Sequence, residues 1–197
     1  MEVQTISDSF PLWLLGRLMN LALEGAHYEA SFGGAHMAFL TCIFPIRHSF
    51  MVKPIPRLRT AISETTSEGT RRSIDSYNRE VEVRKDDSVP DFAVVKATAS
   101  LHDDCLLLIW ELKRDDDDGS QSSIQISRYV RWAVDYQAFI LRWDGRLPNV
   151  LVGQVEQGQA TIYSLTDGLF IQVIQGPVLS EEICGQLRKL AYENRDQ

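Results

Sequence analysis

The nine-residue stretch Cys105–Lys113, "CLLLIWELK", constrains the fold of this chain more than any other stretch. It is an almost unbroken apolar run, as expected for a β-strand that is covered on both faces. We therefore predict a β-sheet with other elements packed against it. The run also carries Glu111 and Lys113. Charged side chains are rarely buried without a partner, so these two need a partner or a chemical role.

Apolar residues at helical spacing predict three helices. The first runs from Pro11 to about Tyr28, with Pro11 near its first turn. The second follows Ser120, a candidate N-cap, and the third follows Ser180. After the first helix, Gly33–Gly34 predicts a break, and the apolar residues beyond it fit either a buried helix or a buried strand.

Strand patterns occupy most of the remaining sequence. Residues 74–83, the stretch "DFAVVKA" and the stretch "CLLLIWELK" predict three consecutive antiparallel strands. Residues 149–174 predict further strands, broken at Gln157–Gly158 and Asp167–Gly168. Residues 53–72 are loop-like and basic at both ends, which fits a mobile solvated loop or a flexible loop that contacts substrate. The order of helix, strands, helix, strands and helix favours an α/β or α+β fold.

The composition is that of an ordinary globular protein, with 44% apolar and 24% charged residues among 197. The longest apolar runs are far shorter than the ~20 residues that span a bilayer, so we predict no membrane segment. The cysteines Cys42, Cys105 and Cys184 are interpreted as reduced core thiols, which favours the cytoplasm or nucleus. The net charge of −7 argues against a general nucleic-acid coat protein, but not against an enzyme with a local basic groove.

The predicted hairpin gathers three charged residues. Side chains alternate between the faces of a strand, so Glu111 and Lys113 share one face. If the hairpin turn is centred on His102, antiparallel pairing places Asp91 opposite Lys113 and Glu111 opposite Ala93. The two carboxylates and the ammonium would then form one small patch.

Two neighbouring carboxylates repel each other unless a cation lies between them. A hard divalent ion, Mg²⁺ or Mn²⁺, suits oxygen ligands from Asp91 and Glu111, with the backbone carbonyl of Leu112 as a further ligand. Lys113 could then orient or deprotonate a water, or stabilise charge in the transition state. The alternative is a salt bridge at the strand end, in which Lys113 pairs with Asp91 and Glu111.

These residues resemble a known motif. "PD" at 90–91 followed by "ELK" at 111–113 resembles the PD-(D/E)XK nuclease superfamily. "QISRY" places Gln125 and Tyr129 four residues apart on the next predicted helix, which is similar to the Q-x-x-x-Y motif of RecB-like members. The resemblance implies a restriction-endonuclease-like fold, with a central mixed β-sheet flanked by helices. It also implies that Gln125 and Tyr129 support the active site and contact nucleic acid.

Other features of the resemblance are not assigned to single residues. Members of the superfamily carry an upstream acid or, in some RecB-type relatives, a metal-binding histidine. The candidates here are Glu24, Glu29, Glu64, Glu80, His27 and His48. Arginines on the motif helix and beyond it fit either backbone contacts to nucleic acid or plain exposed helix surface: Arg128, Arg131, Arg142 and Arg146. The run Asp115–Asp118 fits a solvated loop, a second metal site or an acidic partner-binding loop.

The resulting expectation is one nuclease-like domain over residues 1–197. It comprises a helical N-terminal part with a mobile loop (1–72), the catalytic hairpin and motif helix (73–140), and C-terminal strands with a helix (141–197). The expected activity is Mg²⁺- or Mn²⁺-dependent hydrolysis of nucleic acid, DNA rather than RNA, with a homodimer expected by analogy with the superfamily. The alternatives are a catalytically inactive module on the same fold that binds protein or nucleic acid, and an enzyme of another class.

Overall fold

The computed structural model describes residues 10–24, 29–54, 72–74, 80–82, 90–99, 104–113, 128–129, 133, 150–166 and 169–195. Its helices are α2 (Leu12–Glu24), α3 (Glu29–Ile43), the short 3-10 helix η1 (Ile46–His48) and α5 (Glu181–Glu193). Its strands are β1 (Phe50–Pro54), β2 (Arg72–Ile74), β3 (Glu80–Glu82), β4 (Phe92–Lys96), β5 (Cys105–Lys113), β6 (Leu151–Glu156), β7 (Gln159–Thr166) and β8 (Leu169–Pro177).

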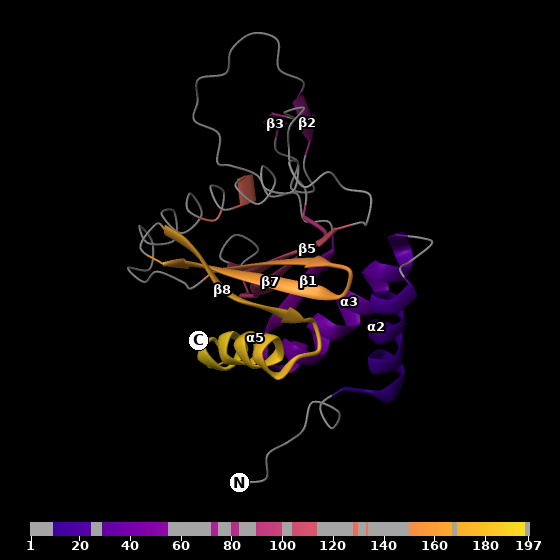
Figure 1. Ribbon diagram of the computed structural model, residues 1–197. Helices are drawn as coiled ribbons and strands as arrows, with labels where there is room; N and C mark the ends of the chain where they lie inside the picture. Colours follow the sequence, from indigo (N-terminus) through magenta and orange to yellow (C-terminus); the bar gives the residue numbers. More distant parts are fainter. Residues whose placement is uncertain are drawn as a thin grey trace.

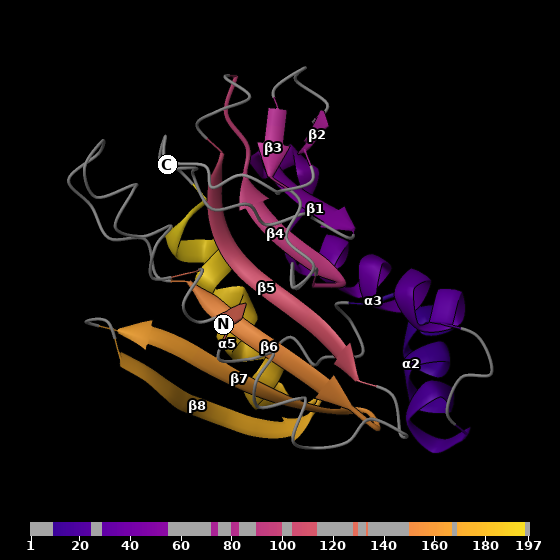
Figure 2. The ribbon, with the colours of Figure 1, turned by 90° about the horizontal axis from the view of Figure 1, so that it is seen from above.

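Six of these strands form one mixed sheet in the order β1-β4-β5-β6-β7-β8. Neighbouring strands are antiparallel, except that β5 and β6 run parallel. Helices α2, α3 and α5 lie together on one face of the sheet, and β5 crosses its interior (Figures 1 and 2). The predicted α+β fold, a central mixed β-sheet flanked by helices, is confirmed.

Strand β5 separates two apolar cores. Leu108 and Trp110 belong to the core beneath α2, α3 and α5. Ile109 lies in the second core, on the opposite face, with Tyr129 and Ala133. The expectation that this strand is covered on both faces is therefore confirmed. Burial of one aliphatic side chain such as Leu108 stabilises the fold by about 1.5–3 kcal/mol.

Helix α3 corrects one prediction. Gly33–Gly34 does not break the chain, because the helix runs from Glu29 to Ile43 through both glycines. A glycine inside a helix costs about 1 kcal/mol relative to alanine. The second half of the helix buries Phe39, Leu40 and Ile43 against the sheet, which outweighs that cost. The open choice between helix and strand for this stretch is thus resolved as helix.

The expected run of three antiparallel strands is also wrong in part. Strands β2 and β3 pair with each other in a separate hairpin. The outer neighbour of β4 is β1, which contains Lys53 and Pro54. Lysine and proline are typical of an edge strand, and here they lie in a stretch that was predicted to begin a loop. Residues 55–71 of the predicted loop lie outside the described part of the chain.

Other predicted elements are confirmed. Helix α2 begins directly after Pro11, and the described residues of the middle helix, including Tyr129 and Ala133, are helical. Ser180 caps α5, since its side chain accepts a hydrogen bond from the Ile183 N–H at 3.2 Å. The capping role of Ser120 concerns a residue outside the described ranges.

The three cysteines differ in their exposure. All three cysteines are free, as predicted, but Cys42 is exposed, Cys105 is half-buried and Cys184 is buried, so they are not all core thiols.

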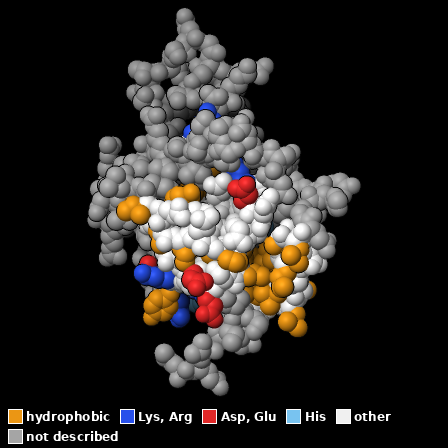
Figure 3. All heavy atoms as spheres, viewed as in Figure 1, with side chains coloured by type: hydrophobic (Ala, Val, Ile, Leu, Met, Phe, Trp, Pro, Cys, Tyr) orange, Lys and Arg blue, Asp and Glu red, His pale blue; other side chains and the backbone are white. Residues whose placement is uncertain are grey.

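Apolar side chains gather on the surface over α2 (Figure 3), among them Trp13 and Leu23. None of the described helices is both long and apolar enough to cross a membrane.

Candidate active site

The β4–β5 hairpin brings Asp91 and Glu111 together. Phe92 pairs with Trp110 and Ala93 pairs with Ile109 at the end of this ladder. Asp91 precedes Phe92 and Glu111 follows Trp110, so the two acids flank the last pair on adjacent strands. Strand alternation places both on the face of the second core.

The expected register was wrong by two residues. It placed Glu111 opposite Ala93 and Asp91 opposite Lys113, whereas Ala93 faces Ile109. A register irregularity between Val94 and Val95 places the pairs nearer the turn still further from the expected register. Because side chains alternate with a period of two, a two-residue offset leaves Asp91, Glu111 and Lys113 on their expected shared face. The expected gathering of the charged residues therefore survives the error.

Asp91 is tied to the backbone of β5. Its Oδ2 accepts a hydrogen bond from the Leu112 N–H at 2.7 Å. A carboxylate that accepts a backbone N–H is held in place by a charge-assisted bond, which is stronger than a neutral one. This contact fixes Asp91 beside Glu111 without using the carbonyl of Leu112, the atom that was expected to bind metal.

The surroundings of Glu111 strongly shift the pKa of its carboxyl. Its side chain is buried, its Oε2 accepts a hydrogen bond from the Tyr129 hydroxyl at 2.9 Å, and its Oε1 lies 3.4 Å from Lys113 Nζ. Burial, followed by the negative charge of Asp91, raises the pKa of Glu111 to about 7, although Tyr129 and Lys113 act in the opposite direction. Near neutral pH the carboxyl is thus poised between its neutral and charged forms, and a nearby cation would favour the charged form.

Lys113 completes the patch on the same face. Only 6% of this residue is exposed, and its ammonium pairs with Glu111. A salt bridge at the strand end was the alternative to a metal site, and the structure contains its Lys113–Glu111 half. Asp91 instead bonds the Leu112 N–H.

Strand β6 adds two residues that sequence analysis missed. The parallel register places Gln154 beside Glu111 and Glu156 beside Lys113. Register partners share a face of the sheet, so both side chains extend the polar patch. Alternating polar residues in "LVGQVE" gave a signal for one polar face, but the sequence could not show which strand lies next to them.

The candidates for an upstream acid, a histidine ligand or an arginine contact come from other parts of the chain. Glu24 ends α2 and Glu29 begins α3, and these helices cover the opposite face of the sheet. Glu80 lies in β3, and the carbonyl of His48 accepts a hydrogen bond from Lys96. Arg128 is exposed next to Tyr129. The remaining candidates lie outside the described residues: Gln125, Glu64, His27, Arg131, Arg142, Arg146 and Asp115–Asp118.

The described residues contain no group of three or more His, Cys, Asp or Glu side chains that could hold a metal ion. A site here would have to combine two carboxylates with backbone or water oxygens. Such a small set of protein ligands is usual for Mg²⁺, which keeps several waters. The donor set of Asp91, Glu111 and the Leu112 carbonyl is therefore chemically suitable for a hard divalent cation.

No protein-family model and no curated protein sequence matches this chain significantly. Among solved structures, the chain is similar to part of a chain in the cryo-EM structure of the DrdV–DNA complex, with a TM-score of 0.47 and 13% sequence identity. The similarity covers 91% of this chain and 13% of the other, so this chain spans a small part of that protein's length. The fold is defined by the sheet order and register of the chain itself.

Proposed function

We propose that this chain is a metal-dependent nuclease that hydrolyses phosphodiester bonds. The carrying observation is the cluster of Asp91, Glu111 and Lys113 on one face of the sheet, with Glu111 buried beside a second carboxylate. The PD and ELK motifs that these residues form also support the proposal. Their resemblance to the PD-(D/E)XK superfamily favours DNA over RNA as the substrate.

The chemistry of the cluster suits a divalent ion. Burial and the charge of Asp91 raise the pKa of Glu111 to about 7 despite the nearby Lys113, so one ammonium does not offset the two carboxylates. Asp91, Glu111 and the carbonyl of Leu112 would hold Mg²⁺ or Mn²⁺. When bound, such an ion stabilises negative charge on a phosphoryl oxygen and acidifies a bound water.

The remaining roles belong to side chains of the chain. Tyr129 holds one oxygen of Glu111 through its hydroxyl, which fixes the direction of the carboxylate. Lys113 carries its ammonium on a flexible stem beside Glu111, so it can orient the attacking water or neutralise charge on the substrate. Gln125 is expected to support the site from the same helix as Tyr129. Arg128 offers an exposed cation for a phosphate of the substrate.

The direct test is cleavage of labelled single- and double-stranded DNA and RNA by the purified protein with Mg²⁺, with Mn²⁺ or with EDTA. We expect cleavage that requires a metal, with DNA cut faster than RNA. Glu111→Gln and Lys113→Met should each lower the rate at least about 100-fold, a loss typical for removal of an electrostatic catalytic group. Glu182→Gln, a matched change at an exposed position of α5, should keep the wild-type rate.

A calorimetric titration with Mn²⁺ separates the nuclease from the inactive module on the same fold. Mn²⁺ binding and nucleic-acid cleavage by the wild-type protein, both of which Glu111→Gln abolishes, support the nuclease. Absence of both cleavage and Mn²⁺ binding would refute it and favour the module that binds protein or nucleic acid.

A further inference from the structure

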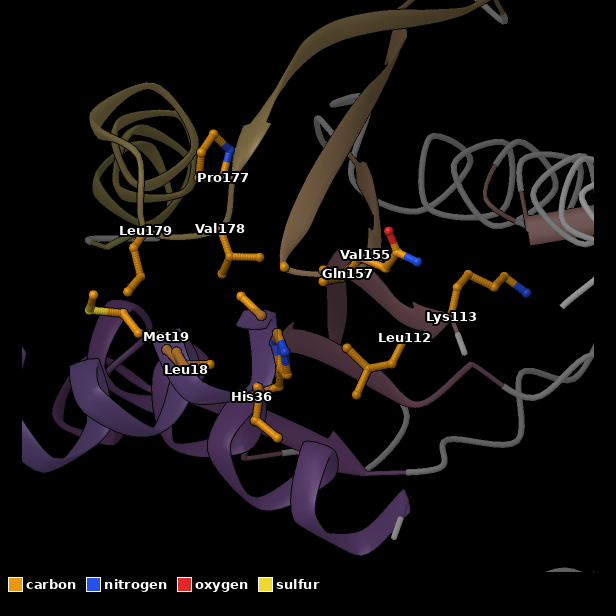
Figure 4. Close-up of a pocket in the computed structure, with 13 residues that line it drawn as sticks. Leu18, Met19, His36, Leu112, Lys113, Val155, Gln157, Pro177, Val178 and Leu179 are labelled. Atoms are coloured by element: carbon orange, nitrogen blue, oxygen red, sulfur yellow. The ribbon is translucent and has the colours of Figure 1, made fainter. Parts of the chain in front are cut away.

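A cavity of about 130 Å³ lies on the face of the sheet opposite the candidate active site. It is bounded by α2, by His36 of α3, by the end of β5, by the β6–β7 turn and by the segment between β8 and α5 (Figure 4). Most of its lining is apolar, including Leu18, Leu112 and Leu179. Met19 lies at its rim and is 56% exposed, so the cavity is reachable from solvent.

The turn between β6 and β7 closes one end of the cavity. Gln157 and Gly158 both have positive φ angles, 48° and 72°, as in the primed turns that join antiparallel strands. A Cβ on Gly158 would lie 2.3 Å from the Cβ of Ala22 in α2. The turn therefore packs tightly against α2, and this wall of the cavity is fixed in place.

His36 is the buried polar group of this cavity. It is 3% exposed and lies between Leu18 and Leu112 in the close-up view (Figure 4). Its Nδ1 accepts a hydrogen bond from the indole N–H of Trp110 at 3.3 Å. An indole N–H can only donate, so Nδ1 must carry a lone pair. Burial lowers the pKa of His36 to about 4, so the ring is neutral at physiological pH and its proton sits on Nε2.

The Nε2–H group is thus a donor in an apolar cavity. Within the described part of the chain, His36 has one hydrogen bond, the one to Trp110, and Nε2–H has no acceptor. Nε2–H is not among the buried atoms left without a partner, so it is open to the cavity, where an acceptor on an incoming molecule can bond it directly. The polar end of Lys113, which also borders the cavity, points away from it toward Glu111 (Figure 4).

We propose that this cavity binds a small, uncharged, mostly apolar molecule that presents one hydrogen-bond acceptor to His36 Nε2–H. A cavity of about 150 Å³ lined by apolar side chains is known to hold benzene, so the space of about 130 Å³ here takes about one small ring or less, and the rest of the ligand extends toward the open rim at Met19. A carbonyl or ether oxygen meets the donor, whereas a charged group would lose its hydration in the apolar lining. The site stands on its own lining residues and does not depend on nuclease activity.

Two probes of nearly the same shape test the role of His36. Acetophenone has a carbonyl acceptor, and α-methylstyrene replaces that oxygen by a CH₂ group. In metal-free protein studied by NMR, acetophenone should saturably shift the backbone amide signals of Leu112 and Val155 and move the His36 Nε2–H proton downfield. α-Methylstyrene should leave that proton without a downfield shift. Absence of saturable shifts at these amides, or the same Nε2–H response to both probes, would overturn the proposal.

A pair of tryptophan substitutions on α2 tests the location. Met19→Trp places a large ring at the rim of the cavity and should weaken acetophenone binding at least about tenfold. Leu23→Trp is the matched control, because Leu23 is 81% exposed on the same helix and does not line the cavity. Equal weakening by both substitutions, or by neither, would refute this cavity as the site.

Discussion

Replacing Glu111 by glutamine should change how the stability of the metal-free protein depends on pH. Burial and Asp91 raise the pKa of Glu111 from 4.5 to about 7, so between these values the folded protein binds a proton that the unfolded chain releases. The contribution to the free energy of unfolding is full below pH 4.5 and is lost as pH rises toward about 7. A shift from 4.5 to about 7 corresponds to about 3 kcal/mol.

His36 has the opposite effect on the same pH range. Burial lowers its pKa from 6.5 to about 4, so here the unfolded chain binds the extra proton. Its contribution to the free energy of unfolding therefore rises as pH increases from about 4 to 6.5, again by about 3 kcal/mol. In the wild-type protein the two contributions largely cancel, so the free energy of unfolding should change little with pH over this range.

Glu111→Gln is nearly isosteric and does not titrate, so it should reveal the contribution of His36. We expect the free energy of unfolding of this variant to rise by about 3 kcal/mol from pH 4.5 to pH 7.5, while that of the wild type changes much less. Urea denaturation in EDTA at several pH values gives both profiles. Glu182→Gln, on the exposed surface of α5, is the control and should follow the wild type. If wild type and Glu111→Gln show parallel profiles, Glu111 does not have the raised pKa on which this reasoning depends.

Three further predictions concern the site and the core. Mn²⁺ must bind the ionised form of Glu111, so its affinity should rise about tenfold per pH unit up to about pH 7 and level off above it; calorimetry showing a pH-independent affinity would contradict this. Tyr129→Phe removes a hydrogen bond to the buried Glu111 carboxylate and should cost about 1–3 kcal/mol of stability at pH 8 and less at pH 5. In the same urea titrations Tyr192→Phe, on the exposed surface, should cost little. Gly153→Ala would place a Cβ 2.3 Å from Trp110 Cε3 and should cost about 1–3 kcal/mol in thermal or urea unfolding, while Gly185→Ala in α5 has open space and should be neutral or stabilising.

Local patterns predicted several elements correctly. The apolar run of β5, the two-residue turn at Gln157–Gly158 and the cap at Ser180 each depend on neighbouring residues alone. The shared face of Glu111 and Lys113 was predicted for the same reason, since alternation along a strand is a local property, whereas Asp91 joins them through the pairing of β4 with β5.

Features set by distant partners were not predictable. The edge strand β1 has a lysine and a proline, and only its pairing with β4 makes it a strand. The glycines of α3 are helical because the apolar side of the helix packs on the sheet. The hairpin register at the site differs from the expected one by two residues because neither the centre of the turn nor the ladder irregularity near Val94 can be read from the sequence. Gln154 joins the site only through the parallel register of β6.

The parallel pairing of β5 with β6 has a consequence for folding kinetics. A parallel pair needs a long crossover, and here residues 114–150 separate the two strands, whereas only residues 97–104 separate β4 from β5. Longer loops cost more entropy to close, so the hairpin should form before β6 docks. Asp91 and Glu111 would then meet while still hydrated, and the desolvation of Glu111 would come only when β6 and Tyr129 arrive. Mutations that make Glu111 neutral should therefore slow unfolding at neutral pH more than they speed folding.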